Sequence, residues 1–159
     1  MKSPLRYPGG KTRAVKHILP HIPEDITELC SPFLGGGSLE LAVAGRGIPV
    51  YGYDIFQPLT NFWHHLLRTP MSLSILSDSY RTSNGTLRGL ARRDFLQFKQ
   101  DLMSAPAKSI TDAAKFYALN RSSFSGATLS GGYSKQAAYK RFTNSSILRL
   151  WTFETYNLE

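Results

Sequence analysis

The amino-acid sequence has 159 residues and is poor in cysteine, in acidic residues and in long apolar runs. Its single cysteine, Cys30, excludes a disulfide framework and a zinc site built from cysteines. No apolar stretch approaches the roughly 20 residues that span a bilayer. The first twenty residues contain five Lys or Arg and no apolar block, which argues against a secretory signal. We therefore expect one soluble, cytoplasmic domain with a sizeable core.

The excess of basic over acidic residues is concentrated in one part of the chain. The formal net charge is +8, and residues 81–141 alone carry +8, with eleven Lys or Arg against three Asp. A localised excess predicts a surface for a polyanion, and it favours nucleic acid over a plain solvated face or a membrane helix. Aromatic residues alternate with these bases, as in surfaces that contact phosphates and sugars or bases. We assign Phe116 and Phe142 to the core first.

The front of the sequence indicates an α/β fold. We expect strands near residues 26–33 and 48–55, and a helix between them through Leu39, Leu41 and Val43. Gly45 or Gly47 should end this helix. Strand, glycine turn, helix and strand form a βαβ unit, which predicts a parallel sheet.

The other segments are predicted to be mainly helical. A short helix is expected near residues 11–19, and helices fill residues 59–101. Residues 121–143 are rich in Ser, Gly, Tyr and Lys, which favours a loop or hairpin. Asn144 is placed to cap a last helix.

Two glycine-containing motifs are candidates for phosphate or nucleotide binding. Residues 8–12 end like a P-loop, but the first glycine of that motif would fall on Leu5, so a nucleoside triphosphate site is excluded. Residues 31–38 follow a strand and open a helix, which suits a ligand-binding loop. They do not form G-x-G-x-x-G, because the last glycine would fall on Glu40. A turn used only for packing is an equal alternative.

Asp54 shifts this balance toward a ligand site. It lies at the end of the second strand, where an acidic side chain can accept both hydroxyl groups of a ribose. The alternative role is the N-cap of the next helix, and the two roles are compatible. His17 and His21 are four residues apart, as two metal ligands on one helix face would be. Pro20 lies between them and should end the helix, which argues against a metal site.

Four motifs occur in order: Pro-Leu-Arg-Tyr-Pro-Gly-Gly-Lys (residues 4–11), Pro-Phe-Leu-Gly-Gly-Gly-Ser (32–38), Tyr-Asp (53–54) and Asn-Arg-Ser-Ser-Phe-Ser-Gly (120–126). Together they resemble the Dam-type, D12-class N6-adenine DNA methyltransferases, which use S-adenosyl-L-methionine. The resemblance implies an incomplete Rossmann-like methyltransferase sheet with an inserted, mainly helical DNA-recognition region. Residues 1–58 would be the front of the cofactor-binding α/β domain and residues 59–143 the basic target-recognition region. Residues 144–159 would be a return helix, and the host would be a prokaryotic or phage-infected cell.

The resemblance also assigns residues to a site. The implied cofactor-binding residues are Tyr7, Lys11, Phe33, Gly35, Gly37 and Asp54. The implied contacts to duplex DNA are Arg6, Asn120 and Arg121, to which the charge pattern adds Lys135, Lys140 and Arg141. Ser31 is a departure, because many members carry an acidic residue there.

A larger departure concerns catalysis. The family holds the adenine amino group with Asp-Pro-Pro-Tyr, and none of the nine prolines here is adjacent to another. We therefore expect that the chain is truncated and inactive alone, and we assign no catalytic residue. The alternatives are a DNA- or cofactor-binding remnant, and a basic α/β domain that binds another nucleotide.

Overall fold

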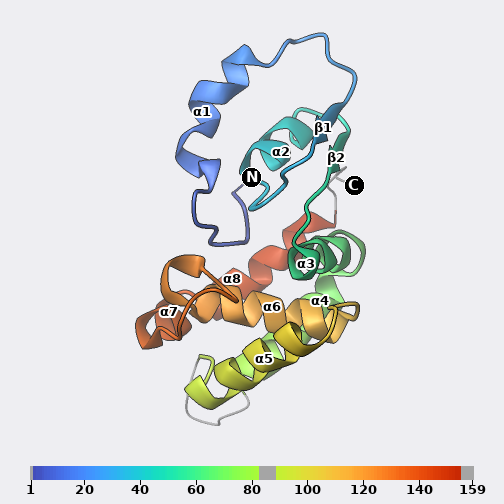
Figure 1. The fold of residues 1–159 in the computed structure, drawn as a ribbon. Helices are drawn as coiled ribbons and strands as arrows, with labels where there is room; N and C mark the ends of the chain where they lie inside the picture. Colours follow the sequence, from blue (N-terminus) through green and yellow to red (C-terminus); the bar gives the residue numbers. More distant parts are fainter. Residues whose placement is uncertain (1, 83–88, 155–159) are drawn as a thin grey trace.

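A computed structural model describes residues 2–82 and 89–154 (Figure 1). The chain forms a small α/β part followed by a larger group of helices, which lies below it in the view of Figure 1. The fold class is therefore mixed α/β, with most of the regular structure in helices.

The α/β part is built on two short parallel strands. β1 (Leu29–Ser31) pairs in register with β2 (Val50–Gly52), and α2 (Ser38–Ala44) connects them. This confirms the predicted βαβ unit. The strands are shorter than predicted, because among the described residues each has only the other as a pairing partner. A full Rossmann-like sheet is not seen in this part of the chain.

Helix α2 packs one face against the sheet. Leu41, Val43 and Val50 are buried together in the core. The helix ends at Ala44, as predicted, and the left-handed residue that follows is Gly47, with a φ of 81°.

The predicted N-terminal helix over residues 11–19 is broken into three pieces. They are η1 (Lys11–Arg13), α1 (Val15–Ile18) and η2 (Leu19–His21). None contains a buried residue, and a short helix without an apolar face to bury is only marginally stable.

Four longer helices form the second part: α3 (Gln57–Arg68), α4 (Pro70–Thr82), α5 (Arg92–Ser104) and α6 (Ile110–Ser122). Helix α6 is central and contacts the other three. A capping box between Ser109 and Asp112 starts it. Its Tyr117 ring stacks on Phe62 with centroids 5.6 Å apart, and Phe116 and Phe142 are fully buried, which confirms their predicted core positions.

The last segment corrects two predictions. The hairpin expected over residues 121–143 consists of η3 (Phe124–Gly126), one antiparallel bridge between Ser123 and Tyr133, and a helix, α7 (Lys135–Lys140), which was not predicted. α7 forms because Ser134 caps it and its Ala137 and Ala138 pack inward. The final helices are α8 (Asn144–Leu148) and η4 (Arg149–Phe153). Thr143, rather than Asn144, caps α8.

Candidate cofactor pocket and nucleic-acid interface

A pocket of about 320 Å³ lies between the turn after Tyr7 and the glycine loop before α2. This volume is in the usual range for small-molecule sites, roughly 300–1,000 Å³. All six predicted cofactor residues line it: Tyr7, Lys11, Phe33, Gly35, Gly37 and Asp54. The fold thus brings three segments that are distant in sequence to one concave surface.

The glycine loop needs its glycines. Gly35 and Gly37 have φ values of 51° and 66°, which side-chain-bearing residues rarely adopt. A Cβ on Gly37 would lie 2.6 Å from the ring of Trp63. The indole Nε1–H of Trp63 donates a hydrogen bond of 3.1 Å to the carbonyl of Gly35. Trp63 is not among the residues that the sequence predicted for this site.

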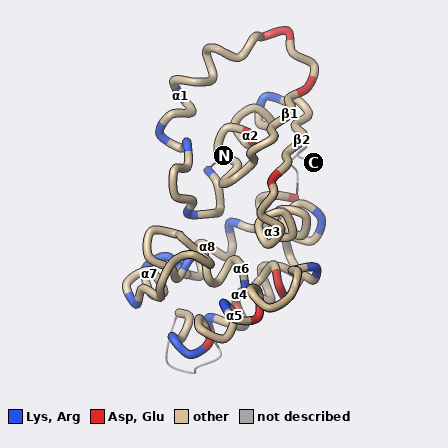
Figure 2. Tube along the Cα trace, viewed as in Figure 1, with Lys and Arg blue, Asp and Glu red and all other residues tan. Residues whose placement is uncertain are grey.

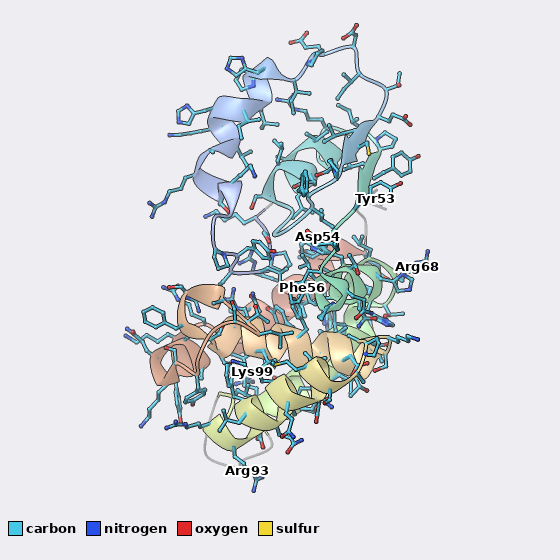
Figure 3. All side chains as sticks on the ribbon, viewed as in Figure 1. Tyr53, Asp54, Phe56, Arg68, Arg93 and Lys99 are labelled. Carbon is cyan, nitrogen blue, oxygen red and sulfur yellow. The ribbon has the colours of Figure 1, made fainter. Side chains whose placement is uncertain are left out.

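Asp54 holds the same loop from the other side. Its Oδ2 accepts a hydrogen bond from the Gly35 N–H (2.9 Å), and its Oδ1 accepts one from the Phe56 N–H (3.0 Å). The N-cap of α3 is Phe56 and not Asp54, the alternative that the sequence offered. The hydrogen bond from the Phe56 N–H to Asp54 instead closes a turn just before the helix. Asp54 and Phe56 lie where the sheet meets the helices (Figure 3).

Tyr7 covers the glycine loop. A Cβ on Gly35 would come within 3.3 Å of its ring, and one on Gly36 within 2.9 Å of its Cβ. Burial, and secondarily the charge of Asp54, raises the pKa of the Tyr7 phenol. The outer part of the pocket is more open, since Lys11 is exposed and the Phe33 side chain is 84% exposed. Tyr7 therefore forms an apolar wall that stays uncharged at neutral pH.

Position 31, where the sequence departs from the family pattern, meets a carboxylate from another element. The Ser31 hydroxyl donates a hydrogen bond of 2.5 Å to Oε1 of Glu40 in α2. Glu40 is 6% exposed and lines the pocket. Sequence reasoning used Glu40 only to reject a dinucleotide motif, so it missed this residue as well.

Asn120, predicted to contact DNA, is fully buried instead. Its carboxamide oxygen accepts a hydrogen bond from the Arg6 N–H (2.9 Å), and its amide nitrogen donates to the Arg6 carbonyl (2.7 Å). The amide nitrogen also donates to the Gly126 carbonyl and to Thr128 Oγ1, so the polar atoms of Asn120 have their partners inside the protein. Asn120 fastens residues 2–6, here called the N-terminal strap, to α6.

A family model for the D12 class N6 adenine-specific DNA methyltransferases matches residues 7–158. The chain belongs to this family. In the comparison with curated proteins, nothing matches. The reaction that gives this family its name is the methylation of adenine at N6 in DNA.

Arg6 and Arg121 also hold the strap. Arg121 donates through Nε to the Arg141 carbonyl (2.7 Å) and through Nη1 to the Pro4 carbonyl (3.2 Å). Arg6 donates through Nη1 to the Ser123 carbonyl (3.1 Å). Burial first, and then the charges of nearby arginines, lowers the pKa of both guanidinium groups. Both side chains thus use some of their N–H donors on backbone carbonyls of the protein itself.

The remaining predicted DNA contacts are free to meet a partner. Lys135, Lys140 and Arg141 are exposed on and next to α7, and Phe124 in η3 is 71% exposed. Figure 2 shows basic residues on α7 and at the start of α5. Within residues 2–82 and 89–154, no ion pair neutralises Arg6, Arg121 or Arg141.

No group of three or more His, Cys, Asp or Glu within residues 2–82 and 89–154 is placed to hold a metal ion. None of the helices in these residues has the length and apolar character needed to cross a bilayer.

Proposed function

We propose that this chain binds S-adenosylmethionine in the pocket around the glycine loop and duplex DNA on the basic surface around α7. The observation that carries the proposal is the convergence of Tyr7, Gly35 and Asp54 on one pocket of suitable size. In this proposal the α/β part is the beginning of a Rossmann-like methyltransferase sheet.

The glycine loop fits the cofactor because it lacks side chains where the ligand must approach closely. Backbone atoms of residues 35–37 line the pocket, and Tyr7 leaves no room for a Cβ at Gly36. The Asp54 carboxylate uses one lone pair of each oxygen on a backbone N–H, which leaves further acceptor sites for ribose hydroxyl groups. The cofactor would supply the methyl group; the chain's residues bind and orient it.

DNA binding is supported by the clustered positive charge. Burial is the first cause of the lowered pKa of Arg6 and of Arg121, and the charge of Arg141 lowers the pKa of both further. Phosphates would relieve this repulsion, and their contacts give affinity rather than sequence reading. Exposed Phe124 in η3 adds an aromatic ring that a base or a sugar can contact.

Turnover is a separate question from binding. Adenine N6 is a weak nucleophile, and its amino group needs hydrogen-bond acceptors as charge develops on nitrogen. Asp-Pro-Pro-Tyr does not occur in these 159 residues. We propose that the chain by itself binds both partners without methylating DNA, which keeps a non-catalytic binding role as the second candidate function.

Calorimetry with S-adenosylmethionine, NAD and ATP tests the cofactor proposal. The chain should bind the first and neither of the others. Asp54→Asn should weaken binding by roughly tenfold or more, since a hydrogen bond to a charged group is worth about 1.5–3 kcal/mol. Binding of NAD or ATP in preference would overturn the proposal.

Transfer of tritium from labelled S-adenosylmethionine to unmethylated duplex DNA tests turnover. A family member that contains Asp-Pro-Pro-Tyr is the positive control. We expect no transfer by the 159-residue chain. Clear transfer would show that other residues accept the N6 protons.

A further inference from the structure

Glu40 is a buried carboxylate in the wall of the cofactor pocket. It is the third residue of α2 and is 6% exposed. Burying a carboxylate is unfavourable unless hydrogen bonds or a cation compensate for the lost hydration. Glu40 therefore needs an explanation that packing alone does not give.

The described residues compensate this charge only in part. The hydrogen bond given to the Glu40 side chain is the one from Ser31 to Oε1. An ionised carboxylate offers about four acceptor sites. The ion pairs within the described residues are Arg81–Asp78, Arg93–Asp94 and Lys115–Asp101, so none neutralises Glu40.

The charges of the pocket select a type of ligand. Its lining contains two carboxylates, Asp54 and Glu40, and one cation, Lys11. S-adenosylmethionine carries two cationic groups, the sulfonium and the ammonium, and one carboxylate, so its charges complement these three residues. Asp54 is fixed at the end of β2 by the Gly35 and Phe56 amides, and in the proposed function it faces the ribose. Glu40 is thus the carboxylate that remains to bind a cationic group of the cofactor.

We infer that Glu40 binds the ammonium group of the cofactor's methionine moiety, opposite Lys11, which faces its carboxylate. This inference rests on the proposed cofactor function and adds a residue to it. Ser31 acts as a positioning residue: by donating to Oε1 it fixes the carboxylate and leaves Oε2 for the ligand. A charge-assisted hydrogen bond in a site shielded from water is stronger than one at the surface.

Three ligands that share the adenosine test the inference. S-adenosylmethionine has the ammonium and the sulfonium charge, S-adenosylhomocysteine has the ammonium without the sulfonium charge, and 5′-methylthioadenosine has neither. Glu40→Gln keeps the size of the side chain and an acceptor for Ser31. Measured by calorimetry, this variant should bind S-adenosylmethionine and S-adenosylhomocysteine roughly tenfold or more weakly. Its affinity for 5′-methylthioadenosine should be unchanged.

Matched variants separate a ligand contact from a general loss of the pocket. Ser31→Ala should weaken S-adenosylmethionine binding less than Glu40→Gln does, again without affecting 5′-methylthioadenosine. Asp54→Asn should weaken all three ligands, because all contain the ribose. If Glu40→Gln weakens all three equally, weakens none, or weakens S-adenosylmethionine alone, the inference is overturned while the proposed function stands. If the unmodified chain binds none of the three, the proposed function fails and the inference with it.

Discussion

The indole N–H of Trp63 donates to the carbonyl of Gly35, so a core residue of the helical part fixes the loop of the cofactor pocket. Trp63 is 2% exposed on α3 and meets the rings of Phe62 and Phe153 edge-on. A ring held on several sides cannot shift to accommodate the loop. The conformation of the loop therefore depends on the packing of the helices.

Replacing Trp63 by Phe should loosen the loop and weaken S-adenosylmethionine binding. The change removes the N–H and its hydrogen bond, worth about 0.5–1.5 kcal/mol, and leaves space beside the loop. Calorimetry should show a several-fold loss of affinity. Trp151→Phe makes the same chemical change at the Trp151–Ser74 contact, away from the pocket, and should leave affinity unchanged. Equal affinities for the two variants would contradict the role of Trp63.

Gly37→Ala should be more destabilising than Gly47→Ala. Both positions have a positive φ, of 66° and 81°, so both alanines suffer similar backbone strain. Only at Gly37 does the added Cβ meet a ring, that of Trp63, whereas Gly47 has nothing within 4 Å. We expect an excess loss of about 1–3 kcal/mol at Gly37, measured by chemical denaturation. A difference near zero would mean that the ring yields.

Asn120→Ala should destabilise the protein by about 2–4 kcal/mol, because it leaves the Arg6 N–H and carbonyl without partners in a buried place. Denaturant unfolding measures this, and Asn144→Ala at an exposed position is the control, with an expected change below about 0.5 kcal/mol. Asn120→Asp is the sharper variant: it keeps an acceptor for the Arg6 N–H but loses the donors. A loss below about 1 kcal/mol for both Asn120 variants would show that the strap is held by other contacts.

The salt dependence of DNA binding should locate the DNA surface. Each phosphate contact contributes about −0.9 to the slope of log affinity against log salt. Replacing Lys135, Lys140 and Arg141 with alanine should flatten the slope by roughly 2–3 with little change in sequence preference. Replacing the exposed Arg13, Lys16 and Arg46 removes the same charge from the α/β part. If the two triple variants behave alike, net charge rather than the α7 surface drives binding.

The sequence predicted the βαβ unit and the pocket residues because their patterns are local. The strand propensity before Asp54 and the glycines before α2 are consecutive features, and a parallel pair follows from them. The family motifs then identified residues that meet only in the fold.

Other features depend on contacts between distant residues, which no local pattern contains. Asn120 and Arg6 are 114 positions apart, so the motif that includes Asn120 suggested a DNA contact and not a buried hydrogen bond. Helix α7 is six residues long within a Ser/Gly-rich segment, and the burial of Ala137 and Ala138 stabilises it more than propensity does. The position of Glu40 beside Ser31 likewise requires α2 to lie against β1.

The N-terminal strap belongs to the helical part in space, although the α/β part separates the two in the sequence. Asn120 of α6 exchanges two hydrogen bonds with the backbone of Arg6, and Arg149 donates to the Lys2 and Ser3 carbonyls. Exchanging residues 57–153 with those of a relative would therefore separate these helices from residues 2–6, which they hold by hydrogen bonds. We expect a chimera of this region to fold best when the strap and the helices come from the same relative.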